Sequence, residues 1–268
     1  MNDFSHLYLN LIKEFNLKKD DILFLSSDVS QLAKYFKSQG GSFDVNVFID
    51  LLQESLSKGT IIIPAFTDLI KNGGEFDWNM SKPTTGALSN RVMKRKDFIR
   101  TDDPLHSVFV WGKHQNELIN QHDESTFGPN SVFGFMEHYP VKMVIMDAHF
   151  QYSFTYVHYI EEKRKVSYRK PYEWMISVRK NGELSLKKIV FYTKRWGIGT
   201  NLNRLQEQLI AKGIVEIKSF HGISLLLLDV SKTGNEIEKF LDNGGRTHEF
   251  KLFQWFKCFV KMVIEKNK

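Results

Sequence analysis

The sequence predicts an α/β fold in which a mixed β-sheet is sandwiched between α-helices, with a smaller antiparallel hairpin part. In the first half, short apolar segments alternate with amphipathic helical segments, the pattern of helices that cover a sheet. In the second half, two alternating segments flank Asn181-Gly182, a dipeptide that favours a type I′ turn. We therefore expect a single domain over residues 1–268, with a hairpin-containing region at about 170–195.

The spacing of apolar residues predicts each element in turn, because helices repeat every 3.6 residues and strands every two. Helices are predicted at residues 2–15, 43–56, 87–95, 113–121, 202–212, 232–242 and 250–266. Strands are predicted at residues 21–25, 61–66, 141–146, 173–178, 184–192 and 223–230.

The composition excludes several classes of protein. With 268 residues, 42% of them hydrophobic and 25% charged, the chain is neither disordered nor collagen-like. Its one cysteine, Cys258, excludes an internal disulfide framework and cysteine-based zinc sites. No apolar run reaches the roughly 18 residues of a membrane span, and residues 1–15 lack the apolar core of a signal peptide. We expect a cytoplasmic protein that binds neither membrane nor metal.

The net charge of +6 favours anionic ligands, which could be nucleic acid or a phosphate-rich cofactor. The most basic segments are residues 163–170 and the C-terminal tail, and neither matches a nucleic-acid-binding motif. We interpret both as solvated faces and expect no nucleic acid partner. The alternative is a non-catalytic protein that binds nucleic acid or another polyanion, for which the motivating residues are Lys251, Lys257, Lys261, Lys266 and Lys268.

Thr155, His158 and Glu161 form the pattern with the clearest chemistry. Spacings of three and six residues keep a hydroxyl, an imidazole and a carboxylate within about 120° of one another on a helix. A carboxylate beside an imidazole can orient it and raise its basicity, which makes a general base. The alternative is a surface helix with an incidental His–Glu pair.

Several other segments are rich in polar residues and turn signals. They are Ser26-Ser27 after a strand, Gly40-Gly41, Asp77 before Pro83–Gly86, the loop Arg100–Ser107, and His122 before Phe127–Ser131. The segment Lys194–Gly199 (KRWGIG) is similar to the glycine-rich, pyrophosphate-binding signature of the commonest acetyltransferase fold. It begins with Lys, however, where that signature has Arg or Gln. We interpret it as a turn.

Taken in chain order, these segments resemble the antibiotic (aminoglycoside) 3-N-acetyltransferase family. The resemblance covers roughly residues 20–165 and rests on the order of the motifs rather than on any one of them. The matching residues are Ser26-Ser27, Gly40-Gly41, Gly59-Thr60, Pro64, Phe76-Asp77, Pro83–Gly86, Arg100–Ser107, His122, Phe127–Ser131 and the Thr155/His158/Glu161 set.

The resemblance implies one acyltransferase domain that moves an acetyl group from acetyl-CoA to an amine, without a metal. It implies that His158 is the general base and that Thr155 and Glu161 belong to the catalytic set, with Glu161 orienting His158 or binding the ammonium. The CoA-binding residues that it implies are Ser26, Ser27, Gly41, Thr85, His106 and Ser107. The acceptor-binding residues that it implies are Asp77, His122 and Glu161.

The motifs depart from the family pattern mainly around the acceptor. Leu25 and Asp103 stand where the family has histidines, Val132 stands for a proline, and Phe154 for an asparagine. Together with the positive charge, these departures favour an amino sugar acceptor, free or nucleotide-linked, of a surface polysaccharide. The alternative is a classical aminoglycoside and hence antibiotic resistance. Trp255 and Phe256 could form a homodimer interface or pack the last helix onto the core, and the sequence leaves both open.

Overall fold

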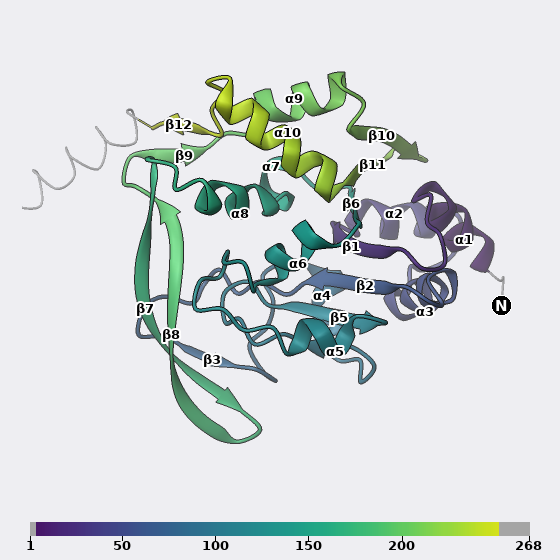
Figure 1. Ribbon diagram of the computed structural model, residues 1–268. Coiled ribbons are helices and arrows are strands. Elements are labelled where there is room, and N and C mark those ends of the chain that lie inside the picture. Colours follow the sequence, from purple (N-terminus) through teal and green to yellow (C-terminus); the bar gives the residue numbers. More distant parts are fainter. Residues whose placement is uncertain (1–3, 252–268) are drawn as a thin grey trace, which may run out of the picture.

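A seven-stranded mixed sheet forms the centre of the protein in the computed structural model, which describes residues 4–251 (Figure 1). The strand order is β10-β11-β6-β1-β2-β5-β4, in which β1 is parallel to both β2 and β6 and the other neighbours are antiparallel. The bounds are β1 (Ile22–Ser27), β2 (Thr60–Pro64), β4 (Ile99–Arg100), β5 (Val108–Gly112), β6 (Val141–Met146), β10 (Val215–Phe220) and β11 (Ile223–Asp229). The predicted mixed sheet is confirmed.

Helices cover both faces of this sheet. One layer consists of α1 (Ser5–Glu14), α2 (Ser30–Ser38), α3 (Val45–Ser55) and α4 (Ala87–Val92). The other contains α5 (Gln115–Ile119), α6 (Val132–His138), α7 (Phe150–Ser153), α8 (Tyr156–Lys163), α9 (Asn203–Ala211) and α10 (Val230–Asp242). The period of two in β1 explains the sandwich, because Leu23 and Leu25 pack in the first layer while Ile22 and Phe24 pack in the second.

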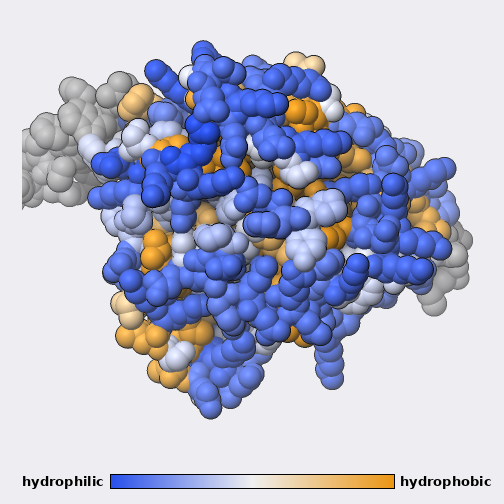
Figure 2. Space-filling view, viewed as in Figure 1, coloured by the Kyte–Doolittle hydropathy of each residue, from blue (hydrophilic) through white to orange (hydrophobic). Residues whose placement is uncertain are grey.

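A long hairpin forms the smaller part of the fold and lies along one side of the molecule (Figure 1). It joins β7 (Arg169–Lys180) to β8 (Glu183–Lys194), and β3 (Glu75–Asp77) completes a three-stranded sheet. Asn181 and Gly182 have φ values of 53° and 86°, as a type I′ turn requires, so the predicted turn is confirmed. Figure 2 shows apolar side chains on this part of the surface, where Leu184 and Leu186 are exposed.

The predicted elements are confirmed where the apolar period is long, and they differ mainly at their ends. The first strand continues to Ser27, so Ser26-Ser27 closes it rather than following it. Helices α2 and α6 and strand β10 were not predicted. The turn in KRWGIG is confirmed, because Arg195–Gly197 links β8 to β9 (Ile198–Thr200) and Gly197 has a φ of 78°.

The end of the chain differs from the prediction where it can be compared. Phe250 belongs to strand β12 (His248–Phe250), which pairs with β9, and not to a helix. The rest of the predicted closing helix, with Trp255, Phe256 and Cys258, lies outside the described residues. Within residues 4–251, no helix has the length and apolar character to cross a membrane, and no group of three His, Cys, Asp or Glu side chains could hold a metal ion.

Candidate active site

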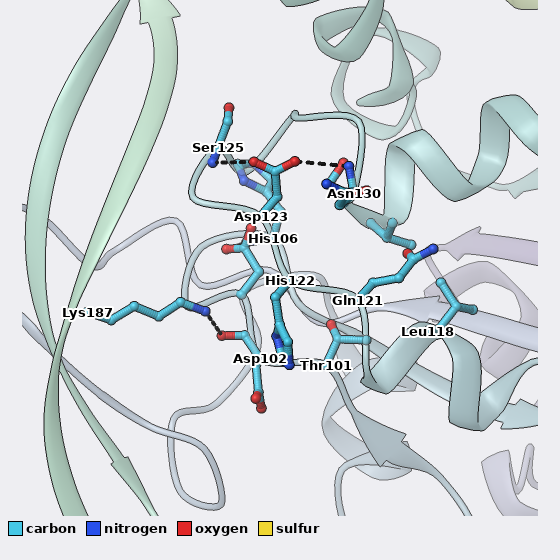
Figure 3. Close-up of a pocket in the computed structure, with 13 residues that line it drawn as sticks. Thr101, Asp102, His106, Leu118, Gln121, His122, Asp123, Ser125, Asn130 and Lys187 are labelled. Carbon is cyan, nitrogen blue, oxygen red and sulfur yellow. Dashed lines mark hydrogen bonds between the residues drawn. The ribbon is translucent and has the colours of Figure 1, made fainter.

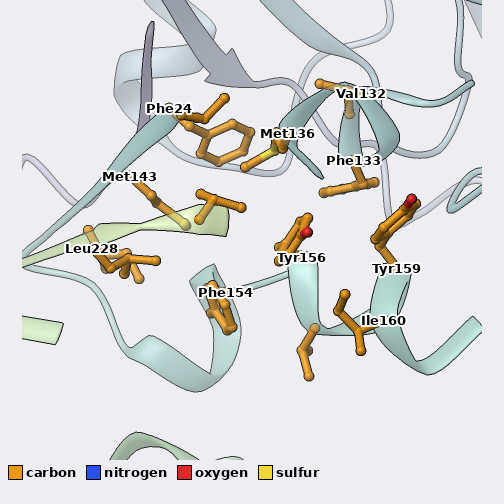
Figure 4. Close-up of a cluster of buried hydrophobic side chains, with 14 of the residues drawn as sticks. Phe24, Val132, Phe133, Met136, Met143, Phe154, Tyr156, Tyr159, Ile160 and Leu228 are labelled. Carbon is orange, nitrogen blue, oxygen red and sulfur yellow. The ribbon is translucent and has the colours of Figure 1, made fainter. Parts of the chain in front are cut away.

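Helix α8 is held in place by a largely apolar face, and this fixes the direction of its polar side chains. Tyr156, Val157, Tyr159 and Ile160 are buried. Figure 4 shows Tyr156, Tyr159 and Ile160 directed into the same cluster as Phe133. A helix packed to this density cannot rotate without opening voids. The remaining side of α8, which carries His158 and Glu161, therefore has one fixed orientation.

His158 and Glu161 are in contact, as the helical spacing predicts. The His158 Nδ1 atom lies 2.7 Å from Oε2 of Glu161. Thr155 is the N-cap residue of α8 and has helical backbone angles. It therefore continues the helical spacing of His158 and Glu161 by three residues toward the N-terminus. Thr155 and His158 both line a cavity of about 410 Å³. Glu161 does not line the cavity, because its side chain is fully buried behind the imidazole.

Four side chains from three parts of the chain hold the Glu161 carboxylate. His158 and Arg169 both approach Oε2, and Arg169 Nε forms an ion pair with it. The Tyr168 hydroxyl donates to Oε1 at 3.0 Å, and the Thr247 hydroxyl donates to the same oxygen. Burial raises the pKa of this carboxyl, but His158 and Arg169 outweigh that effect and lower its pKa to about 2. Glu161 is therefore ionised at neutral pH, and its carboxylate oxygens are bound by side chains of the protein.

The charge on Glu161 determines the tautomer of His158. A carboxylate can only accept hydrogen bonds, so Nδ1 carries the proton and Nε2 keeps its lone pair. The Arg169 guanidinium lies beside the ring, with Nη2 at 2.8 Å from Nδ1 and 3.3 Å from Nε2. Burial and the positive charge of Arg169 lower the pKa of His158 to about 4. The imidazole is therefore neutral at pH 7 and can accept a proton.

Positive charge predominates in the His158 cavity. Three cationic side chains, Arg169, Lys194 and Lys251, line it, and Asp68 is the one carboxylate among its described lining residues. Phe66, Phe127 and Phe191 supply apolar wall. The cavity thus combines the His158 imidazole with surroundings that favour an anion.

His106 is the one member of the predicted CoA set that lines this cavity. Its Nδ1 atom is 2.9 Å from the Thr126 hydroxyl, and burial lowers its pKa. Ser107 is fully buried, where its hydroxyl donates to the Ala65 carbonyl and accepts from Arg100. The Ser107 hydroxyl thus makes both of these hydrogen bonds within the protein.

The other predicted CoA residues are near the carboxyl ends of the parallel strands. Ser26 and Ser27 end β1, and the Thr85 hydroxyl donates to the carbonyl of Pro64, which ends β2. The Ser27 Oγ atom is buried and has no hydrogen-bond partner among the described residues, so its hydrogen-bonding capacity is unused. Crevices at the carboxyl ends of parallel strands are common ligand sites. Gly41 lies in the loop between α2 and α3, where a Cβ atom would be 2.6 Å from the Phe4 ring.

Asp77 and His122 lie outside the His158 cavity. The Asp77 carboxylate accepts from the backbone N–H groups of Asn79 and Met80, both at 2.9 Å, and so caps the turn after β3. Figure 3 shows His122 beside Asp102 in a separate hollow, which His106 divides from the His158 cavity. The structure therefore does not bring these two predicted acceptor residues together with Glu161.

The sequence prediction missed Arg169, Tyr168, Thr247 and Asp68. Arg169 falls in the basic segment at 163–170, which was interpreted as a solvated face, and for Arg169 that interpretation is wrong because its side chain is 3% exposed. The basic segment itself was visible in the sequence. No local pattern, however, marks one arginine of the segment as the partner of a carboxylate eight residues earlier.

Comparison with known proteins identifies the family and the fold. The family model for aminoglycoside 3-N-acetyltransferase matches residues 28–242. The YokD protein from Bacillus subtilis has a similar structure, with a TM-score of 0.72 and 18% identity over 88% of this chain and 92% of that one. AAC-IIIb in its binary complex with CoASH has a TM-score of 0.74 and 15% identity, over 91% and 97% of the two chains.

A third similar structure is AAC-VIa bound to sisomicin, with a TM-score of 0.73 and 15% identity over 90% of this chain and 97% of that one. At such identities these structures establish the fold alone. No curated protein sequence matches the chain. The family model, however, spans most of the sequence, and it includes the Thr155, His158 and Glu161 set. The chain therefore belongs to the aminoglycoside 3-N-acetyltransferase family of acetyl-CoA-dependent N-acetyltransferases.

Proposed function

We propose that the protein transfers the acetyl group of acetyl-CoA to a primary amine of an amino sugar, with His158 as the general base. The observation that carries this proposal is the neutral imidazole of His158, held by the buried Glu161 carboxylate at the wall of a cavity. A protonated amine has no free lone pair, so it must release one proton before it attacks, and a base must take a second proton from the attacking nitrogen as the amide forms.

The reaction then proceeds in two steps. The amine nitrogen attacks the thioester carbonyl carbon while His158 Nε2 takes its proton, which forms a tetrahedral intermediate with an oxyanion. When the oxyanion re-forms the carbonyl double bond, the C–S bond breaks and the CoA thiolate leaves. His158 then donates the proton to the thiolate sulfur. Glu161 stabilises the imidazolium between these steps. Thr155, whose side chain lines the same cavity, is available to contact the reacting groups.

Two features support acetyl-CoA as the donor. The unpartnered Ser27 Oγ atom at the end of β1 can accept or donate a hydrogen bond to the cofactor. The side chains of Lys194 and Lys251 in the cavity wall suit its phosphate groups. We propose that Ser26, Ser27, Gly41, Thr85, His106 and Ser107 surround the cofactor, with Ser107 contributing through its backbone because its hydroxyl is already bonded.

The charge of the cavity favours an amino sugar over a polycationic drug. Arg169, Lys194 and Lys251 repel an acceptor with several ammonium groups, and Asp68 offers a single compensating carboxylate. An amino sugar with one amine, free or linked to a nucleotide, avoids this repulsion. Such an acceptor would belong to the synthesis of a surface polysaccharide.

The test is release of thiol from acetyl-CoA, measured against free amino sugars, nucleotide-linked amino sugars and aminoglycosides. We expect turnover with an amino sugar that is lost in His158→Ala. The matched control is His114→Ala, which removes an imidazole that lies on another part of the surface and lines neither cavity near α8. Turnover with aminoglycosides alone would show that the acceptor assignment is wrong, and full activity in His158→Ala would refute the general base.

A further inference from the structure

A second cavity of about 760 Å³ adjoins the His158 cavity along α8 and has no role in the reaction described above. Its walls come from α6, from α8 and from the ends of β7 and β8 where the hairpin joins the body (Figure 1). The charged and polar residues that line it are Glu137, His138, Glu162, Lys163, Lys165, Ser167, Arg169, Lys170 and Arg195.

The positive charge of this second cavity is not neutralised. Lys163 is paired with Glu137 and Glu238. Lys165, Lys170 and Arg195 are exposed and form no ion pair within residues 4–251. Three unpaired cations around one hollow create a potential that attracts an anion, and a flat guanidinium together with ammonium groups suits phosphate oxygens.

The rest of the wall is apolar or offers an acceptor. The rings of Tyr159 and Tyr192 have hydroxyl groups that already donate, to Glu137 and to the Val166 carbonyl respectively. Both tyrosines are largely buried, so with Pro129 they supply apolar wall to the cavity rather than open ring faces. Glu162 lines the cavity and its Oε2 atom is buried without a hydrogen-bond partner among the described residues, so a ligand hydroxyl would satisfy it once the side chain turns toward the cavity. A ligand that carries phosphate, a planar ring and a hydroxyl group would match these features, and a nucleotide has all three.

The second cavity adjoins the first. Arg169 and Phe127 line both cavities, so the two cavities share these side chains as a common wall. The guanidinium that neutralises Glu161 thus stands between the reacting amine and any anion bound in the second cavity.

We infer that the second cavity binds the phosphate-bearing, nucleotide part of the acceptor while the amine reaches His158. This assignment rests on the proposed acetyl transfer and narrows its acceptor to a nucleotide-linked amino sugar. CoA also carries phosphates, and Ser26, Ser27, Thr85 and Ser107 line neither this cavity nor the His158 cavity. We place the cofactor at the strand ends where Ser27 and Thr85 lie, and titration in the presence of CoA tests that placement.

The experiment is calorimetric titration of the full chain with uridine 5′-diphosphate, in the absence and in the presence of saturating CoA. We expect binding that persists when CoA is bound and that weakens at least about tenfold in Lys170→Ala/Arg195→Ala, which removes two charge-assisted contacts. The matched control is Lys37→Ala/Lys94→Ala, which removes the same charge from exposed positions on and near α2 and α4 and should change the affinity less than about twofold.

Four results would overturn the assignment: no binding, competition with CoA, equal weakening in the control, or pyrophosphate binding as tightly as the nucleotide. Competition would mean that CoA itself occupies the cavity, and tight pyrophosphate binding would mean that the aromatic walls hold no base. The titration needs no turnover. Nucleotide binding without any acetylation would therefore support this site while refuting the proposed function.

Discussion

Two carboxylates predicted to meet the acceptor, Glu161 and Asp77, have very different surroundings. Glu161 is fully buried on α8, where Arg169, Tyr168, Thr247 and His158 bind both of its oxygens. Asp77 lies at the end of β3, where it accepts two backbone N–H groups of its own turn. Both side chains are carboxylates, but of the two only Glu161 contacts a group that lines the His158 cavity.

The comparison shows that the partners of a charged side chain decide its role. Three partners of Glu161 lie within eight residues of it, Thr247 comes from a distant segment, and the set includes the imidazole that lines the His158 cavity. Asp77 accepts from two N–H groups within three residues and lies 4.0 Å from the partly exposed Arg179 guanidinium, so it mainly completes local structure. Changes around Glu161 should therefore alter chemistry and global stability, whereas changes at Asp77 should alter neither strongly.

The largest expected difference is in catalysis. His158→Ala removes the group that Glu161 orients and should lower kcat by about 10²–10⁴-fold, the range that general bases contribute. Asp77→Asn should change kcat by less than about threefold, because the amide oxygen still caps the turn. Steady-state thiol release from both variants measures the contrast. A large loss of kcat in Asp77→Asn would place that carboxylate back in the acceptor site.

The next largest effect is on stability. Glu161→Gln leaves the Arg169 guanidinium buried without its carboxylate, and breaking a buried ion pair in this way costs about 3–5 kcal/mol. Urea unfolding of the purified variant measures the change. Glu75→Gln is the matched control, because it breaks an exposed pair with Arg179 and should cost less than about 1 kcal/mol. Equal losses in the two variants would contradict the buried network.

Stability should also fall as the pH falls, because the folded-state pKa values of His158 and Glu161 both lie below their ordinary values. The unfolded chain then binds more protons, so the stabilising contribution is complete above pH 6.5 and is lost on acidification. The His158 contribution is lost from about pH 6.5 to 4 and that of Glu161 from about 4.5 to 2. Urea unfolding at several pH values tests this, and unchanged stability between pH 7 and 4 would contradict it.

Arg169 should set the acid limit of activity. Its positive charge lowers the pKa of His158, so Arg169→Gln should raise the midpoint of the acid limb of kcat/KM by about one pH unit or more. A merely structural role would lower kcat/KM at every pH without moving the midpoint. The measurement is kcat/KM from pH 4 to 8 for both proteins.

The smallest effect is expected in the turn after β3. Asp77→Ala removes the acceptor of the Asn79 and Met80 N–H groups and should cost about 1 kcal/mol, with kcat unchanged within about threefold. Thermal unfolding and thiol release of the same preparation measure both quantities. A loss of stability as large as that of Glu161→Gln would show that this turn supports far more of the fold than its local contacts indicate.

The sequence by itself determined what depends on neighbours along the chain. Periodicity located β1, β2, β6 and β11 of the central sheet and most helices, Asn181-Gly182 determined the turn of the hairpin, and the three-residue spacing of Thr155, His158 and Glu161 determined their common side. Helical and turn geometry repeat within a few residues, so such patterns can be read locally.

Only the tertiary structure decided which distant groups complete the site. Arg169 comes from the start of β7 and Thr247 from the segment before β12, and sheet pairing and helix packing bring them to Glu161. The same long-range packing buried Arg169, directed Asp77 and His122 elsewhere, and opened a second cavity along α8. A pKa shift follows from burial and from charges within a few ångströms, and neither is a property of local sequence.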